Sequence, residues 1–171
     1  RETVLLALFA RQRLFEIADK ESIDFNLEKR GILHFYHNKQ DYDVAIRVND
    51  LLNKGWLERC GVSNEEIKQI EPTLTGDYYA GFYCEGDATG DIHKYTTGLA
   101  EVTKKLGVKY RFGMDVTDIQ HLTSGVEVKL QPSSENVELA PAEVEMLAAD
   151  AVVVCAGVGS YQLAELVQER V

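Results

Sequence analysis

The segment from Asp150 to Ala156 carries an apolar side chain at every position but the first, and it runs directly into a glycine turn. Apolar side chains on both faces are typical of a strand that other elements cover on both sides. The turn, from Gly157 to Ser160, leads into an amphipathic stretch with helical spacing. The pattern therefore predicts a strand, a turn and a helix, as in a doubly wound sheet with helices packed on it.

The same turn has two interpretations. Glycines at the end of a strand leave room for a ligand to touch the backbone, and the start of a helix offers free N–H donors for a phosphate. Glycines also serve simple turn geometry without any ligand. The residue three positions after Gly159 is Gln162 rather than glycine, so the turn is not a dinucleotide fingerprint. Spacing alone leaves both interpretations open.

Apolar side chains recur at three- and four-residue steps in several parts of the chain, which predicts helices. Asn38 and Ser63 are residue types that cap the start of a helix, and each has an acidic residue three positions later. Gly55 and Gly107 are expected to end helices. The helices are predicted over residues 3–20, 39–54, 64–71 and 92–106, with a last one after residue 160.

Alternating or aromatic-rich segments predict strands over residues 31–37, 78–84, 108–112, 116–121, 126–130 and 144–147. The first of these is expected to pair with residues 26–28 as an antiparallel hairpin. Strands and helices are mixed up to about residue 88. From about residue 89 the order is helix, strand, meander, buried strand and helix. We therefore expect an α+β fold with α/β character in its second half.

Charge and cysteine content narrow the function. The chain has 18 Lys and Arg residues against 28 Asp and Glu residues, and this net charge of −10 argues against a nucleic-acid or anionic-membrane binder. No apolar run approaches the roughly 18 residues of a membrane span. Cys60, Cys84 and Cys155 are widely spaced. We therefore expect reduced, buried thiols in a cytosolic protein, with neither a metal site nor a disulfide framework.

Two groups of residues are candidates for contact with a ligand. The loop from Gly86 to Lys94 either caps the following helix through Thr89 or Asp91, or brings a ligand to the point where that helix begins. His93, in the same loop, is more simply a solvated residue of the first helical turn than a catalytic base. An aromatic group either fills a core or lines a substrate cavity. It comprises Phe35, Tyr36, Tyr78, Tyr79, Phe82 and Tyr83.

Six stretches then occur in a definite order: residues 30–36 (RGILHFY), 67–74 (IKQIEPTL), 80–82 (AGF), 86–96 (GDATGDIHKYT), 106–108 (LGV) and 149–157 (ADAVVVCAG). In that order they resemble the D-amino-acid oxidase superfamily of FAD-dependent oxidoreductases. Within it the chain is most similar to the small subunit of bacterial D-amino-acid dehydrogenase. Each stretch is modest by itself, and the ordered set is what is specific.

The resemblance implies three parts. These are a helix of the flavin or interdomain region over residues 1–20, a segment of the substrate-binding domain over residues 21–88, and part of the FAD-binding domain over residues 89–171. The superfamily's amino-terminal GxGxxG unit and the arginine that holds the substrate carboxylate have no counterpart here. The chain is therefore expected to be an internal fragment that retains no FAD and has no turnover. Its open strand edges and apolar faces are expected to lead either to self-association or to a partly rearranged packing.

The resemblance also implies site residues. The backbone of Val116 is expected on the adenine side of FAD, and Ala156 and Gly157 are expected to approach the cofactor after the buried strand. Gly90 and Asp91 are expected near the flavin ring or the substrate, and Tyr36 is a further candidate on the substrate side. No catalytic residue and no metal ligand is assigned.

For the intact protein the resemblance implies oxidative deamination of a D-amino acid, with hydride transfer from Cα to flavin N5. A quinone or electron-transfer chain would take the electrons, and the protein would lie in the cytoplasm or at the inner membrane face. One alternative is a related flavin oxidase or dehydrogenase acting on glycine, sarcosine or a 2-hydroxy acid. The other is a non-catalytic module that binds a small ligand or a partner.

Overall fold

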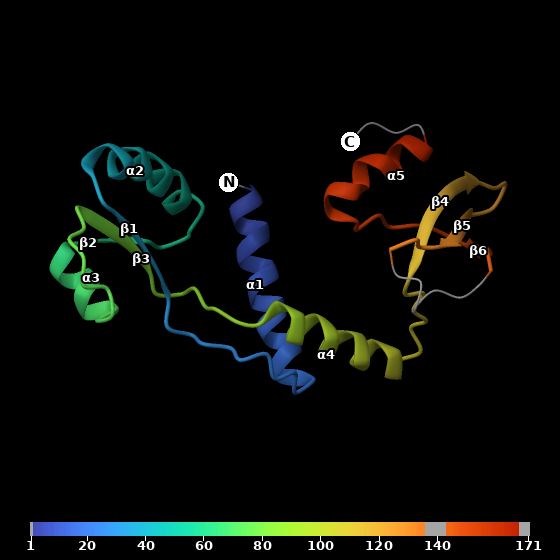
Figure 1. Cartoon of the computed structure of the whole chain (residues 1–171), viewed down its shortest axis with the longest axis horizontal. Helices are drawn as coiled ribbons and strands as arrows, with labels where there is room; N and C mark the ends of the chain where they lie inside the picture. Colours follow the sequence, from blue (N-terminus) through green and yellow to red (C-terminus); the bar gives the residue numbers. More distant parts are fainter. Residues whose placement is uncertain (1, 136–142, 168–171) are drawn as a thin grey trace. The chain divides into compact units, whose positions relative to one another are not determined.

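The computed structural model describes residues 2–135 and 143–167, which belong to two compact units (Figure 1). The first unit is Arg1–Val108 and the second is Lys109–Val171. Each combines helix with a three-stranded sheet, which confirms the predicted mixture of the two. Every strand pair among the described residues is antiparallel, whereas a doubly wound sheet is mostly parallel. The assignment of residues 1–20, 21–88 and 89–171 to domains stays a prediction.

The first unit has a sheet in the order β1–β3–β2, so its last strand in sequence lies in the middle. Its strands are β1 (Ile32–Tyr36), β2 (Cys60–Val62) and β3 (Ala80–Cys84). Its helices are α1 (Glu2–Lys20), α2 (Lys39–Asn53), α3 (Asn64–Ile70) and α4 (Ile92–Lys105). The predicted helix starts are confirmed, because the side chains of Asn38, Ser63 and Asp91 each accept a hydrogen bond from a backbone N–H in the first turn.

Helices α2 and α3 contact opposite faces of this sheet at the middle strand (Figure 1). On one face, the ring of Tyr42 from α2 stacks on Phe82, with 5.1 Å between ring centres. On the other, Ile67 from α3 is fully buried, and its Cδ1 lies 3.2 Å from the point where a Cβ of Gly81 would stand. Neighbouring strand residues point to opposite faces, so Gly81 and Phe82 place one helix on each side.

Residues 25–31 do not fold back onto β1, so the predicted hairpin is wrong. They run antiparallel to residues 87–91, and Glu28 and Thr89 exchange two backbone hydrogen bonds of 2.9 and 3.0 Å. Strand β1 pairs instead with β3, from Ile32 opposite Cys84 to Tyr36 opposite Ala80. The reason is that both segments find partners far along the chain, and local residue patterns carry no information about such pairings.

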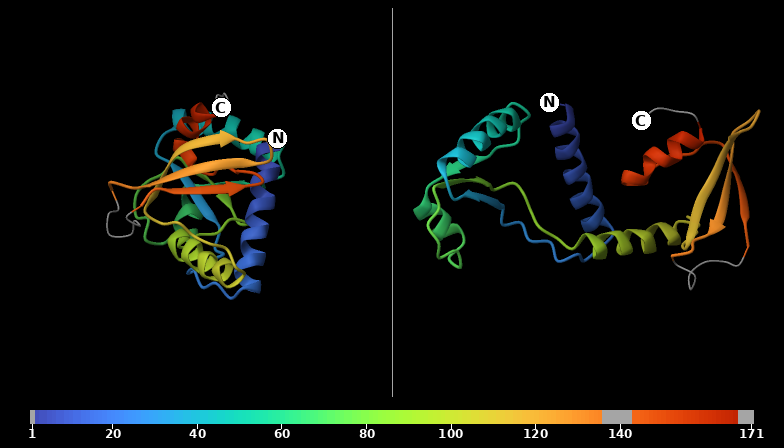
Figure 2. Two further views of the ribbon diagram at one scale, coloured as in Figure 1. Left: turned by 90° about the vertical axis from the view of Figure 1, so that its right-hand side faces the viewer. Right: turned by 45° about the horizontal axis from the view of Figure 1, so that its top comes forward.

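The second unit is a meander in the order β4–β5–β6 (Figure 2). Its elements are β4 (Met114–His121), β5 (Val126–Pro132), β6 (Glu145–Ala149), the 3₁₀ turn η1 (Gly157–Gly159) and α5 (Ser160–Leu166). Helix α5 contacts β4, and Ile119, Leu130 and Ala164 are buried. The pairing of β4 with β5 shifts between Val116 and Asp118, which marks a β-bulge.

Two predicted strands of the second half are not strands in the structure. Residues 108–112 and 150–156 have no strand partner among the described residues. Val153 is 84% exposed rather than buried on both faces. An isolated extended segment gains no ladder hydrogen bonds, so an apolar pattern becomes a strand only where neighbouring strands are in place.

Replacing Ser63 by alanine tests the cap of α3. Glu66 accepts a 2.7 Å hydrogen bond from the Ser63 backbone N–H, and this bond and the Ser63 hydroxyl hold the pKa of Glu66 below its ordinary 4.5. A lowered pKa means that this contribution to stability is present above pH 4.5 and is lost as pH falls through the folded-state pKa.

We expect S63A to raise the pKa of Glu66, measured by NMR titration, and to lower the free energy of unfolding by about 0.5–2 kcal/mol. Glu71 is an internal reference, because its pKa is lowered by hydrogen bonds from Thr73 instead. An unchanged Glu66 pKa in S63A, or an equal rise at Glu71, would contradict this account.

Candidate functional site

The crossing of residues 25–31 and 87–91 borders an apolar cavity of about 340 Å³ against α1. Its wall includes Gly90, one of the predicted substrate-side residues. The remaining wall residues are Arg11, Leu14, Phe15, Phe25, Leu27, Ile32, Asp87, Ala88, Thr89 and Ile92. An apolar cavity with one ion pair at its edge is the usual composition of a small-molecule site.

Arg11 and Asp87 form that ion pair and join α1 to the crossing. Asp87 is also a hydrogen-bond partner of the Cys84 side chain, and its backbone O accepts from Gly31 N at 3.1 Å. Burial, followed by this hydrogen bond and the Asp87 charge, raises the pKa of the Cys84 thiol. The raised pKa favours the protonated form of this buried thiol. The prediction of buried thiols is thus confirmed for Cys84 and wrong for Cys60 and Cys155, which are exposed.

Gly90 and Asp91 lie where the crossing meets α4. A Cβ on Gly90 would stand 2.6 Å from Cε2 of the buried Phe25 ring, so only glycine fits there. Asp91 caps α4 by accepting from Lys94 N at 3.0 Å, and its own backbone N donates to Phe25 O at 2.7 Å. The capping interpretation of Asp91 is thus confirmed, and its proposed contact with a ligand stays a prediction.

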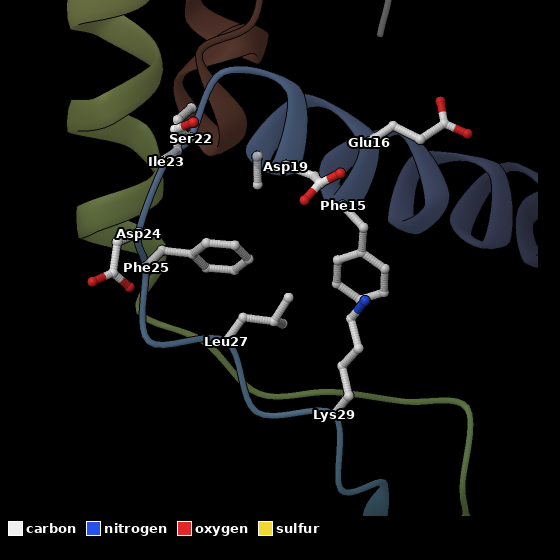
Figure 3. Close-up of a pocket in the computed structure, with 10 residues that line it drawn as sticks. Phe15, Glu16, Asp19, Ser22, Ile23, Asp24, Phe25, Leu27 and Lys29 are labelled. Carbon is white, nitrogen blue, oxygen red and sulfur yellow. The ribbon is translucent and has the colours of Figure 1, made fainter.

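A second, more polar cavity of about 720 Å³ shares Phe15, Phe25 and Leu27 with the apolar one, and Figure 3 shows the side chains that line it. In Figure 3 the Lys29 amino group lies at the Phe15 ring, at 4.8 Å from its centre. Asp19, Asp24 and Glu16 give its rim a negative charge. Phe25 lines both cavities and also packs edge-to-face on Tyr95 of α4.

Tyr36 lies apart from these cavities, in the aromatic cluster between the sheet and α2. Its ring packs edge-to-face on Tyr42 and Phe82, at 5.9 and 6.4 Å. His34 is on the same strand two residues earlier, and therefore on the same face. Burial and the nearby Arg59 charge lower the pKa of His34, while Asp87 opposes the shift. Tyr36 thus lies on the same strand face as His34, whereas Gly90 and Asp91 lie together at the start of α4.

The three residues predicted to contact FAD are all in the second unit. Val116 is half-buried beside the bulge of β4, while Ala156 and Gly157 are exposed. Gly157 has φ of +55°, and no heavy atom lies within 4 Å of the place where its Cβ would stand. The backbone of this turn is therefore open to a ligand, which is the property that contact with a cofactor requires.

Sequence patterns missed Arg11, Phe25 and Arg59. Arg11 meets Asp87 across 76 positions of the chain, and no local pattern announces such a pair. Phe25 alternates with polar neighbours, which suggested only a strand. Among the described residues, no group of three or more His, Cys, Asp or Glu side chains could hold a metal ion. The described part also contains no helix that is long and apolar enough to cross a membrane.

A double-mutant cycle on R11M and D87N tests the ion pair. We expect a coupling of about 1–2 kcal/mol in urea unfolding, because the two side chains are only 32% and 25% exposed. The same cycle on Arg13 and Glu16, which are 58% and 44% exposed, should give about 0.5 kcal/mol or less. Equal coupling in the two cycles would show that the Arg11–Asp87 pair is an ordinary surface contact.

The chain is similar in sequence to proteins of known family. The family description "FAD dependent oxidoreductase" (DAO) matches residues 1–171. D-amino acid dehydrogenase 3 of Mesorhizobium japonicum is 42% identical over 170 residues, which are 99% of this chain and 39% of that protein. The D-amino acid dehydrogenase of Dechloromonas aromatica is 34% identical over 161 residues, 92% of this chain and 37% of that protein. The chain therefore spans about two fifths of these relatives.

Solved structures share the fold at low sequence identity. L-amino acid deaminase from Proteus vulgaris has a TM-score of 0.73 at 19% identity, covering 96% of this chain and 37% of that one. Glycine oxidase from Geobacillus kaustophilus has a TM-score of 0.72 at 19% identity, covering 96% and 41%. The family match over the whole chain and the identity to curated relatives agree with this fold. The chain belongs to the DAO family of FAD-dependent oxidoreductases.

Proposed function

We propose that the intact protein oxidatively deaminates D-amino acids with FAD as its cofactor. The observation that carries the proposal is the 42% identity to a D-amino acid dehydrogenase over 99% of this chain. The open turn at Gly157 and the apolar cavity at Gly90 support it, because the first can accept a cofactor and the second a small substrate.

In this proposal Val116, Ala156 and Gly157 hold FAD through their backbone, Val116 on its adenine side. FAD, when bound, supplies the acceptor for the hydride that leaves the substrate Cα. The chain's own residues orient the substrate and keep water away from it. Gly90 leaves the space that any side chain would fill, and Asp91 keeps the start of α4 in place.

The finer parts of the proposal concern partners and location. We propose transfer of electrons to a quinone or electron-transfer chain, and a cytoplasmic protein that associates with the inner membrane face. We also propose that the 171-residue chain alone retains no FAD, has no turnover and self-associates. Flavin absorbance near stoichiometric amount in the purified chain would contradict the proposed loss of FAD, and light scattering measures the self-association.

A second candidate is a related flavin oxidase or dehydrogenase that acts on glycine, sarcosine or a 2-hydroxy acid. Glycine oxidases from Bacillus cereus and Geobacillus kaustophilus share the fold, with TM-scores of 0.70 and 0.72. Glycine, sarcosine and 2-hydroxy acids are therefore the substrates to compare with D-amino acids. Family membership favours both enzyme interpretations over a non-catalytic module.

The experiment is a substrate panel on the full-length enzyme that contains this chain. D-alanine, L-alanine, glycine, sarcosine and 2-hydroxyglutarate are each supplied with an artificial electron acceptor and with oxygen. The proposal expects turnover of D-alanine with the artificial acceptor and formation of pyruvate and ammonia. Turnover of glycine or sarcosine without D-alanine would favour the second candidate.

A further inference from the structure

The apolar cavity at the crossing has a wall with almost no uncompensated charge. Among the described residues that line it, the charged side chains are Arg11 and Asp87, and they form an ion pair with each other. Arg11 also borders a cavity lined by Glu58 and Glu85, but the ion pair it forms within the described part of the chain is with Asp87. Apart from the Thr89 hydroxyl, the other side chains of the wall are hydrocarbon or aromatic. A charged guest would therefore find no free counterion in this cavity.

Backbone groups of the same wall are also occupied. Thr89 exchanges two backbone hydrogen bonds with Glu28, of 2.9 and 3.0 Å. The backbone O of Asp87 accepts a hydrogen bond from Gly31 N at 3.1 Å. Because these groups already bond to each other across the crossing, a polar guest gains few hydrogen bonds in exchange for those that it gives up with water.

The cavity is small, and its wall is held in place by packing. Its volume of about 340 Å³ is near the lower end of the roughly 300–1,000 Å³ that is typical of small-molecule sites. Phe25 in the wall is buried and packs edge-to-face on Tyr95, with 5.3 Å between ring centres. Leu14, Phe15 and Leu27 of the wall pack against the same buried cluster. A supported apolar wall of this size suits one small apolar group.

We infer that this cavity takes the side chain of the substrate and selects apolar side chains, and that the Arg11–Asp87 pair is what excludes charged ones. Each partner of the pair cancels the charge that would otherwise attract an oppositely charged guest. The inference rests on the proposed function, since it takes the substrate to be a D-amino acid. It goes beyond that function by naming the substrate class, which is D-amino acids with apolar side chains.

Removing one partner at a time should change the selectivity in opposite directions. R11M leaves the Asp87 carboxylate without its counterion, and D87N does the same to the Arg11 guanidinium. The full-length enzyme that contains this chain is assayed with D-leucine, D-lysine and D-glutamate. In the wild type, kcat/KM for D-leucine should exceed that for either charged substrate about 100-fold. R11M should raise the ratio of D-lysine to D-leucine about 10-fold, and D87N should raise the ratio of D-glutamate to D-leucine by a similar factor.

A ratio of two substrates in one preparation does not depend on the amount of folded enzyme, so a loss of stability alone leaves it unchanged. R13M and D43N are the matched controls, because they make the same two substitutions in exposed ion pairs outside the cavity wall. Their ratios should equal those of the wild type. The inference requires both opposite shifts, so an unchanged ratio in either R11M or D87N contradicts it. Equal kcat/KM for D-leucine and either charged substrate in the wild type would overturn it without any variant.

Binding without turnover separates this inference from the proposed function. The probes are 3-methyl-1-butanol, glutarate and 1,5-diaminopentane, and the signals are the methyl NMR resonances of Leu14, Leu27 and Ile92 in the purified chain. In the wild type only the alcohol should give saturable shifts, whereas R11M should also bind the diamine and D87N should also bind glutarate. No saturable shift with the alcohol would overturn the inference. Absence of any D-amino-acid turnover in the wild type would refute the proposed function and the assignment to a substrate side chain, while the titration still decides the selectivity of the cavity.

Discussion

Replacing Gly125 by alanine is expected to destabilise the β4–β5–β6 sheet by about 2–5 kcal/mol. Gly125 ends the turn between β4 and β5 with φ of +89°, a conformation that residues with a Cβ rarely adopt. An added Cβ would also stand 2.3 Å from the backbone O of Ala149, at the end of β6. The backbone of a paired strand cannot move aside cheaply, so both costs apply.

The measurement is urea unfolding, followed by a probe confined to the second unit, such as NMR signals of β5. G157A is the matched control in the same unit, because Gly157 also has a positive φ but no atom within 4 Å of its Cβ position. G157A should lower the free energy of unfolding by only about 1–2 kcal/mol, which is the penalty for a left-handed backbone at a residue with a Cβ. Equal losses in G125A and G157A would show that contact with Ala149 contributes nothing.

Replacing Ile67 by alanine is expected to destabilise the first unit by about 2–5 kcal/mol. The Ile67 side chain is fully buried between α3 and the sheet, and its Cδ1 packs at the Cβ position of Gly81 on β3. Truncation leaves a cavity at the middle strand, whose two neighbours are β1 and β2.

I70A is the matched control, since Ile70 lies at the end of the same helix and is 37% exposed. It should cost less than about 1 kcal/mol in the same urea experiment, because little apolar area is lost. If I67A lowers the free energy of unfolding no more than I70A does, the packing of α3 on the sheet does not stabilise the first unit.

The candidate site could be predicted from sequence only where the signal is local. Asp91 was recognised as a cap or a ligand-side residue because both roles follow from its place before a helix, and the structure confirms the cap. Gly90 was singled out by resemblance, and the close approach of Phe25 now gives a physical reason for glycine there. Arg11 left no local signal, because its partner Asp87 lies 76 positions away in the sequence.

The same distinction between local signals and long-range contacts applies to the fold. The strands β4, β5 and β6 follow from alternation of apolar and polar residues, a pattern that acts between neighbours in sequence. The strand predicted at residues 150–156 is not formed, although its apolar pattern is strong, because a strand needs partners that the described residues do not provide. The residues proposed to contact FAD, including Ala156 and Gly157, follow this segment and stay predictions.

The amino-acid sequence by itself determined the starts of α2, α3 and α4, the mixture of helix and strand, and the family, whose ordered stretches can be read along the chain. Each of these depends on interactions within a few residues or on order alone. Only the tertiary structure decided that residues 25–31 pair with 87–91, that Arg11 neutralises Asp87, and that Ile67 is buried against Gly81. These contacts join distant residues, and they are selected by the burial of apolar surface and the pairing of polar groups over the whole unit rather than by any local preference.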